Sequence, residues 1–208
     1  MIEPAVLLAY IAIVLGFVFI PGPATLLTVA RATSSGTKAG IATGAGVAVG
    51  DVIHTAMAVI GISAIIATSA LLFSLIKYLG AAYLVYLGIR AMLEKTPAIT
   101  SGARVPLTAQ QAFRQAVIAE VLNPKTALFF LAFLPQFVDP ANGLIWLQLT
   151  LFGLIFVCLG LLSTVVFAVG AGGLGNFLRR NPTVLKWQGR VVGGIYCGLG
   201  LRLAFQER

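Results

Sequence analysis

Apolar residues occur in long runs along this chain, and polar residues are confined to the segments between them. A run needs about 20 predominantly apolar residues to cross a bilayer as a helix. Six runs approach or exceed this length, and we predict a transmembrane helix from each. Their approximate limits are 5–30, 39–66, 71–92, 113–138, 144–169 and 187–205. The sixth is the least apolar, because Arg190 and Arg202 flank its glycine-rich centre.

The longest polar stretch, residues 94–112, separates two halves of about 1–93 and 112–208. No run is left over for a soluble domain, so residues 1–208 are expected to form one transmembrane domain. Only 10% of the residues are charged and 59% are hydrophobic, whereas a soluble domain carries about 25% charged residues. Charge this sparse cannot cover a water-facing surface, and we predict an all-α integral membrane protein in contact with the lipid bilayer.

Basic residues gather in alternate connections between the predicted helices. The connections after helices one, three and five, with their edges, hold ten of the fourteen Lys and Arg residues: Arg31, Lys38, Arg90, Lys95, Arg104, Arg114, Arg179, Arg180, Lys186 and Arg190. Basic connections favour the cytoplasmic side of a membrane, so the loop at 94–112 is expected in the cytoplasm and both termini outside. These residues form no continuous stripe, which argues against a nucleic-acid partner.

Two short motifs recur in the second half of the chain. PATLL at 23–27 resembles PKTAL at 124–128, and LGIR at 87–90 resembles LGLR at 199–202. The matches align predicted helix one with helix four, and helix three with helix six. Three is an odd number, so the second half must cross the membrane in the opposite direction. We therefore predict two inverted three-helix repeats, an architecture of secondary transporters.

Proline and glycine interrupt the first and fourth predicted helices. The first carries Pro21, Gly22 and Pro23, and the fourth carries Asn123 followed by Pro124. Proline removes a backbone donor and clashes with the preceding turn, and lipid cannot satisfy the backbone groups that a break exposes. Broken helices at matching positions predict a central substrate site. The alternative is that the prolines only kink the helices for packing.

Ionisable residues within the predicted helices are candidates for the substrate and proton pathway. Asp51 and His54 lie three residues apart on helix two, on one face, and together they could relay protons. The alternatives are structural: Asp51 would be hydrogen-bonded to a backbone N–H freed near a break, and His54 would only donate a structural hydrogen bond.

Three further candidates, Glu120, Asn123 and Lys125, surround the second break. Glu120 and Lys125 could pair with each other, and Lys125 could instead neutralise Asp51 or hold a substrate carboxylate. The plainer alternative is that both charges point into water near a helix end.

Several motifs together resemble the LysE/RhtB family of amino-acid exporters. They are PGPATLL at 21–27, SGTKAG at 35–40, GAGVAVGDVIH at 44–54, YLGAAYLVYLGIRAM at 78–92 and NPKTALFFLAFLPQFV at 123–138. The resemblance covers nearly the whole chain. It implies a six-helix fold and export of amino acids or close derivatives across the bacterial inner membrane, driven by the proton gradient. Glu120 departs from the family pattern, which usually has an uncharged residue there.

The sequence fits two other functions, cation export and intramembrane catalysis, less well than export of amino acids. A cation or metal exporter would want several acids, histidines or cysteines converging, and the chain has one His and two acids within its helices. An intramembrane enzyme would need clustered catalytic groups, and there is no GxxxxGK[ST] motif for ATP. We therefore predict a secondary transporter rather than an enzyme, with no cofactor and no metal site. Glycines at 36–50 would permit a homodimer through close helix packing.

Overall fold

The computed structural model describes residues 2–19, 22–68, 70–93, 106–180 and 182–205. Within them the chain forms eight α-helices, one π-helical turn, two 3₁₀ turns and no strand, which confirms the predicted all-α fold. The elements are α1 (Pro4–Phe19), α2 (Pro23–Ser35), α3 (Thr37–Thr68), α4 (Ala70–Leu93), α5 (Ala109–Val121), α6 (Pro124–Leu128), the π turn η1 (Phe129–Phe133), the 3₁₀ turns η2 (Leu134–Phe137) and η3 (Pro140–Asn142), α7 (Ile145–Arg180) and α8 (Pro182–Phe205).

Both predicted interruptions separate two helices. α1 ends at Phe19 and α2 begins at Pro23, with a bend of 48° between them. Pro21 lies outside the described residues. α5 ends at Val121 and α6 begins at Pro124, with a bend of 44° between α5 and the segment 124–137. Proline is the first residue of each second helix, where its missing N–H has no helical partner to lose.

Two helices contain stretches that are long and apolar enough to cross a membrane, residues 37–65 of α3 and 145–171 of α7. Each bent pair would make one further span. These four correspond to predicted helices one, two, four and five. α4 and α8 correspond to predicted helices three and six, and a total of six crossings stays a prediction. The predicted fifth helix, about 144–169, agrees with the span 145–171, and α7 continues beyond it through a glycine-rich stretch to Arg180.

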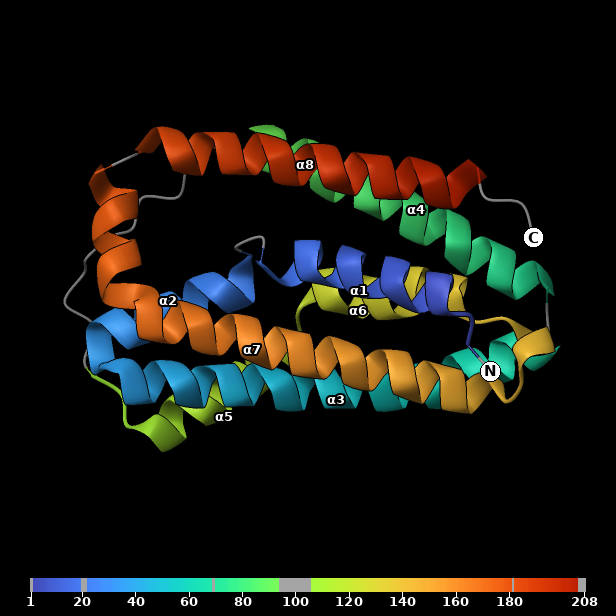
Figure 1. The fold of residues 1–208 in the computed structure, drawn as a ribbon, viewed down its shortest axis with the longest axis horizontal. Helices are drawn as coiled ribbons and strands as arrows, with labels where there is room; N and C mark the ends of the chain where they lie inside the picture. Colours follow the sequence, from blue (N-terminus) through green and yellow to red (C-terminus); the bar gives the residue numbers. More distant parts are fainter. Residues whose placement is uncertain (1, 20–21, 69, 94–105, 181, 206–208) are drawn as a thin grey trace.

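Corresponding elements of the two halves run in opposite directions. Figure 1 shows α3 running from left to right and α7 from right to left, and the same opposition for α4 and α8. α3 packs on α7 and α4 packs on α8. Figure 1 shows the start of α1 and the end of α8 toward the right, and the α2–α3 connection toward the left. This connection, which Arg31 and Lys38 flank, therefore lies away from the start of α1 and the end of α8.

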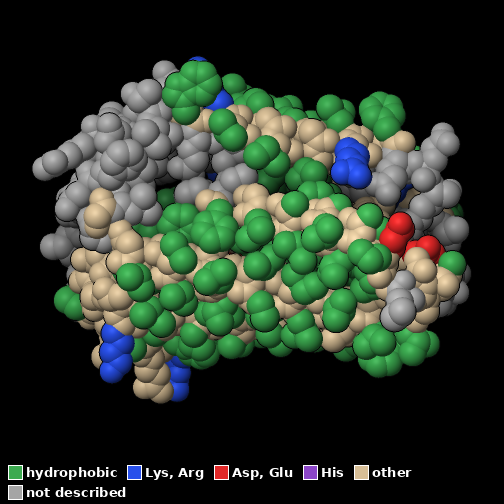
Figure 2. Space-filling view, in the orientation of Figure 1, with side chains coloured by type: hydrophobic (Ala, Val, Ile, Leu, Met, Phe, Trp, Pro, Cys, Tyr) green, Lys and Arg blue, Asp and Glu red, His purple; other side chains and the backbone are tan. Residues whose placement is uncertain are grey.

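The surface between the two ends is apolar. Large hydrophobic side chains are exposed along α3, α4 and α7, among them Ile60, Leu71 and Leu154. Figure 2 shows one face covered mainly by hydrophobic side chains, with Lys and Arg at the lower left and Asp and Glu at the right-hand end. Such a surface suits contact with lipid.

Glycines of α3 are used for packing within the chain. A Cβ atom at Gly46 would lie 2.4 Å from the carbonyl oxygen of Phe113, and one at Gly50 would lie 2.5 Å from Cβ of Glu120. α5 can therefore approach α3 closely only because these positions lack side chains. Gly44 packs against Thr164 of α7 in the same way. A homodimer stays a prediction, and it would have to use another face.

Candidate functional site

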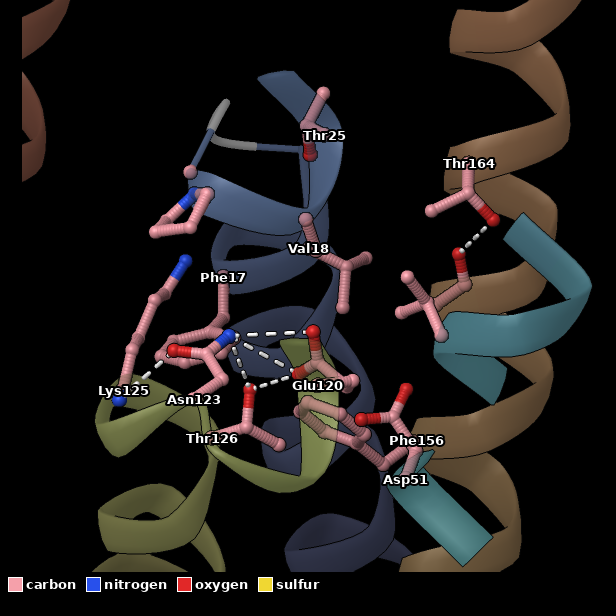
Figure 3. A pocket seen from close by; sticks show the side chains of 15 residues that line it. Phe17, Val18, Thr25, Asp51, Glu120, Asn123, Lys125, Thr126, Phe156 and Thr164 are labelled. Carbon is pink, nitrogen blue, oxygen red and sulfur yellow. Dashed lines mark hydrogen bonds between the residues drawn. The ribbon is translucent and has the colours of Figure 1, made fainter. Parts of the chain in front are cut away.

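The two helix breaks face one cavity inside the molecule (Figure 3). Elements from both halves of the chain line it. Among its lining residues are Gly22, Pro23, Thr25, Asp51, Glu120, Asn123, Lys125 and Thr126. Its volume is about 40 Å³, and a water molecule takes about 30 Å³ in the liquid. The cavity in this conformation therefore has room for one or two waters but not for an amino acid.

Most of the predicted site residues meet at this cavity. Asp51, Glu120, Asn123 and Lys125 line it, together with Gly22 and Pro23 of the first break. Pro124 starts α6 with an exposed side chain, and neither Pro124 nor His54 is among the lining residues.

Glu120 lies in the last turn of α5 and is held by three hydrogen bonds. Nδ2 of Asn123 lies 3.1 and 3.2 Å from the two carboxylate oxygens, and the hydroxyl of Thr126 donates to Oε1. Glu120 is 3% exposed, so these bonds replace the water that the carboxylate loses on burial. The start of α5 is fixed by a capping box between Thr108 and Gln111.

Thr126 was not among the predicted site residues, although the repeat contains a signal for it. PATLL and PKTAL align Thr25 with Thr126. Both threonines are buried and both line the cavity. Threonine occupies the third position of both motifs, directly after a break. This match could have identified both threonines as candidate site residues.

Asn123 also caps the helix that follows it. Its Oδ1 accepts a hydrogen bond from the backbone N–H of Lys125 at 3.1 Å. The corresponding cap of α2 is Gly22, which makes no side-chain hydrogen bond to the helix. The first turn of α2 therefore presents backbone N–H groups that no capping side chain occupies.

Lys125 extends from α6 alongside Phe17 toward the start of α2 (Figure 3). Its Nζ lies 4.1 Å from the centre of the Phe17 ring and 5.5 Å from that of Tyr196. A Cβ atom at Gly22 would lie 3.0 Å from Nζ. Among the described residues it forms no salt bridge with Asp51 or Glu120, so the pairing considered from the sequence is not made in this structure.

Asp51 is the second buried carboxylate of the cavity and differs from Glu120 in its surroundings. It is 2% exposed, and Oδ1 has no hydrogen-bond partner among the described residues. Oδ2 faces α7, where a Cβ atom at Gly160 would lie 3.3 Å away. Burying a charged or polar atom without a partner is costly. Asp51 therefore has an oxygen free to accept a donor inside the cavity.

His54 points to the backbone near the second break. Its Nε2 donates to the carbonyl oxygen of Glu120 at 2.9 Å, and its ring stacks on Phe130 with centroids 5.9 Å apart. This geometry agrees with the structural alternative, in which the histidine holds a backbone group near the break. Among the described residues, no three His, Cys, Asp or Glu side chains lie close enough together to hold a metal ion.

Comparisons with known proteins agree with the predicted class. Residues 15–207 match the family described as LysE type translocator. An uncharacterized membrane protein of Vibrio cholerae is 32% identical over 197 residues, which cover 95% of both chains. The Bacillus subtilis membrane protein YrhP is 34% identical over 211 residues, 94% of this chain and 97% of that protein.

A third relative carries a functional name. A leucine efflux protein of Salmonella choleraesuis is 30% identical over 194 residues, covering 90% of this chain and 89% of that protein. No solved structure gives a significant match. The matched family is one of transporters rather than enzymes, which confirms the resemblance seen in the sequence, and the chain belongs to the LysE type translocator family.

Proposed function

We propose that the protein is a secondary transporter that exports amino acids or close derivatives across the bacterial inner membrane by proton antiport. The observation that carries this proposal is the cavity between the two breaks, which Asp51 and Lys125 both line without pairing with each other. Oδ1 of buried Asp51 has no partner among the described residues, and Nζ of Lys125 lies over the Phe17 ring. An amino acid is a zwitterion, and the cavity offers complementary groups for both of its charges. The name of the Salmonella relative agrees with this substrate class.

The substrate carboxylate would bind between Lys125 and the start of α2. A thirteen-residue helix presents a partial positive charge at its N-terminus, and free N–H groups there bind anions. The closeness of Gly22 to Nζ of Lys125 puts a full positive charge beside these groups. The start of α6 is a weaker candidate, because Asn123 already occupies the N–H of Lys125.

The substrate ammonium would bind to Asp51 rather than to Glu120. Glu120 already accepts three hydrogen bonds, whereas Oδ1 of Asp51 has no partner among the described residues. Antiport needs a group that binds a proton and the substrate in turn. Asp51 can do this, since a proton and an ammonium group compete for the same carboxylate oxygens.

Transport would use the two inverted halves, about 1–93 and 112–208, as moving parts of a six-helix domain. The opposite directions of α3 and α7 and of α4 and α8 support this repeat. The central cavity is too small for an amino acid in this conformation, so transport requires it to widen. Alternating access then requires one half to move against the other around a fixed site.

A chain of aromatic rings closes the cavity toward the end that carries the termini. Phe17 lines the central cavity and contacts Phe129, which in turn lies near Tyr10 and then Phe137, with ring centroids 4.6, 6.5 and 4.9 Å apart. Phe129 begins the π turn η1, and such turns inside helices often occur at functional sites. Movement of η1 would separate these rings and open the cavity.

Growth rescue tests the substrate class. The chain is expressed in a strain that lacks its amino-acid exporters, and the strain is challenged with toxic levels of each amino acid in turn. Rescue should occur with one or a few amino acids and should be lost in Asp51→Asn, while membrane insertion of that variant is unchanged. Rescue that is equal in wild type and Asp51→Asn would contradict the proposed site.

The orientation has its own test. In a background without Cys158 and Cys197, single cysteines are introduced at positions 101, 141 and 181. The positive-inside rule predicts that an impermeant thiol reagent labels position 141 in intact cells and spares 101 and 181. The opposite labelling would reverse the orientation.

A further inference from the structure

A second and larger cavity lies at the end of the molecule where the chain begins. Its volume is about 450 Å³, within the range of roughly 300–1,000 Å³ that is typical of small-molecule sites. It lies between the start of α1 and the segment η2–η3, with Gln148 of α7 at its edge. An amino acid fits this volume, in contrast to the central cavity.

An adjoining cavity of about 180 Å³ continues toward α8. The two cavities share Val6, Gln136 and Phe137 in their walls, so these side chains adjoin both. Arg202 and Leu199 of α8 bound the smaller one. We name the two cavities together the outer vestibule. Its walls include Glu3 in the larger cavity, Arg202 in the smaller one, and Gln136 in both.

Two polar residues of the vestibule are occupied in holding the loop between η2 and α7. The carboxylate of Asp139 accepts from the N–H of Ala141 at 2.9 Å and from Nδ2 of Asn142 at 3.0 Å. Gln148 accepts from the N–H of Asp139 at 3.1 Å and donates to its carbonyl oxygen at 2.8 Å. These groups shape the wall and have little capacity left for a ligand.

Other polar groups of the vestibule remain available. Gln136 donates through Nε2 to the carbonyl oxygen of Ala132 at 3.2 Å, but its buried Oε1 has no partner among the described residues. The exposed carboxylate of Glu3 also has no recorded partner within the described part of the chain. Both are acceptors that line the larger cavity, and an ammonium group is a donor that suits such acceptors.

Arg202 supplies a positive charge in the wall of the smaller cavity, which Gln136 also lines. It ends the LGLR motif of the second half, and its counterpart Arg90 ends LGIR in the first. Because α4 and α8 run in opposite directions, the motif carries Arg90 toward the basic end and Arg202 toward the termini (Figure 1). The positive-inside rule gives no reason for a cation there.

We propose that the outer vestibule is a second amino-acid site, separated from the central cavity by the aromatic rings. The substrate ammonium binds Oε1 of Gln136 and the carboxylate of Glu3, and the substrate carboxylate binds Arg202. The substrate class rests on the proposed function, whereas the existence of a site rests on the volume and the polar groups of the vestibule. An amino acid leaving the central cavity would pause here, and amino acid outside the cell would occupy the site and slow export.

The test is the binding stoichiometry of purified full-length protein, measured by equilibrium dialysis with each radiolabelled amino acid. Wild type should bind two equivalents of the preferred amino acid. Gln136→Leu and Arg202→Gln should each reduce this to one, and Asp51→Asn should remove the other. Arg202→Lys, which keeps the charge, should restore the second equivalent. Arg90→Gln is the matched control at the same motif position of the first half and should leave two.

The outcomes separate this proposal from the central site. One equivalent in wild type that Asp51→Asn removes, and that Gln136→Leu and Arg202→Gln leave unchanged, would overturn the vestibule site and leave the proposed function in place. Two equivalents that persist in both vestibule variants would also overturn it. No saturable binding of any amino acid by wild type would contradict both proposals.

Discussion

The two helix breaks occupy corresponding positions in the two halves, but they present different chemistry to the cavity. The first is made of backbone, with Gly22 as a cap that has no side chain to offer. The second is a polar network in which Asn123 caps α6 and binds Glu120, while Lys125 extends across the cavity. We propose that the first break is the one open to a ligand, because the second has satisfied its own groups.

The difference shows how a repeat can become a site with two unlike ends. The residues 101 positions before Glu120, Asn123 and Lys125 are Phe19, Gly22 and Ala24, and none of them carries a charge. Asp51 likewise has Phe152 as its counterpart. The acid free in the cavity therefore comes from the first half and the lysine from the second. Such an arrangement can orient a zwitterion, which two identical ends could not.

Lys125→Met should cause the largest loss of amino-acid affinity, because it removes the charge that extends from the second break toward the first. We expect amino-acid affinity of the purified protein to fall about 100-fold, since losing one partner of a buried charge contact costs roughly 2–5 kcal/mol. Binding to detergent-solubilised protein measures it. Lys77→Met is the matched control, because Lys77 is a buried lysine that does not line the cavity. Equal losses in both variants would contradict the assignment.

Gly22→Asn would make the first break resemble the second. The new side chain could cap α2 as Asn123 caps α6, and its Cβ would crowd Nζ of Lys125. We expect affinity to fall about ten-fold, equal to ~1.4 kcal/mol, with thermal stability unchanged or higher because a cap is gained. Gly61→Asn in α3, where a Cβ atom meets nothing within 4 Å, is the control for the substitution itself. Undiminished affinity in Gly22→Asn would remove the start of α2 from the site.

Valine at the paired threonines should separate a structural role from a binding role. Thr126→Val removes a hydrogen bond to buried Glu120 and should destabilise the protein by ~1–3 kcal/mol. Thr25→Val removes no side-chain hydrogen bond between described residues. We therefore expect its free energy of unfolding to fall by no more than about 0.5 kcal/mol. Unfolding of the purified protein in detergent compares the two. A larger loss of stability in Thr25→Val would mean that the first break is not the open one.

The breaks and most of the residues that line the central cavity could be predicted from the sequence because proline acts locally. A helix rarely continues through a proline, so Pro23 and Pro124 interrupt their apolar runs, and a charge in such a run must find a cavity or a partner. The sequence could not separate Asp51 from His54, since their shared helix face does not fix how far each side chain reaches. The apolar run also does not show where α7 ends, because a glycine costs only about 1 kcal/mol in a helix and α7 continues past residue 169 to Arg180.

The most direct test of the central claim compares the two buried carboxylates in proteoliposomes that carry a proton gradient. Export of the preferred amino acid is measured over a series of pH values for wild type, Asp51→Asn and Glu120→Gln. Asp51 has a free oxygen in the cavity and Glu120 does not. The account predicts that Asp51→Asn abolishes proton-driven export, while Glu120→Gln keeps the pH dependence of wild type at a reduced rate. Full export with an unchanged pH profile in Asp51→Asn would contradict it.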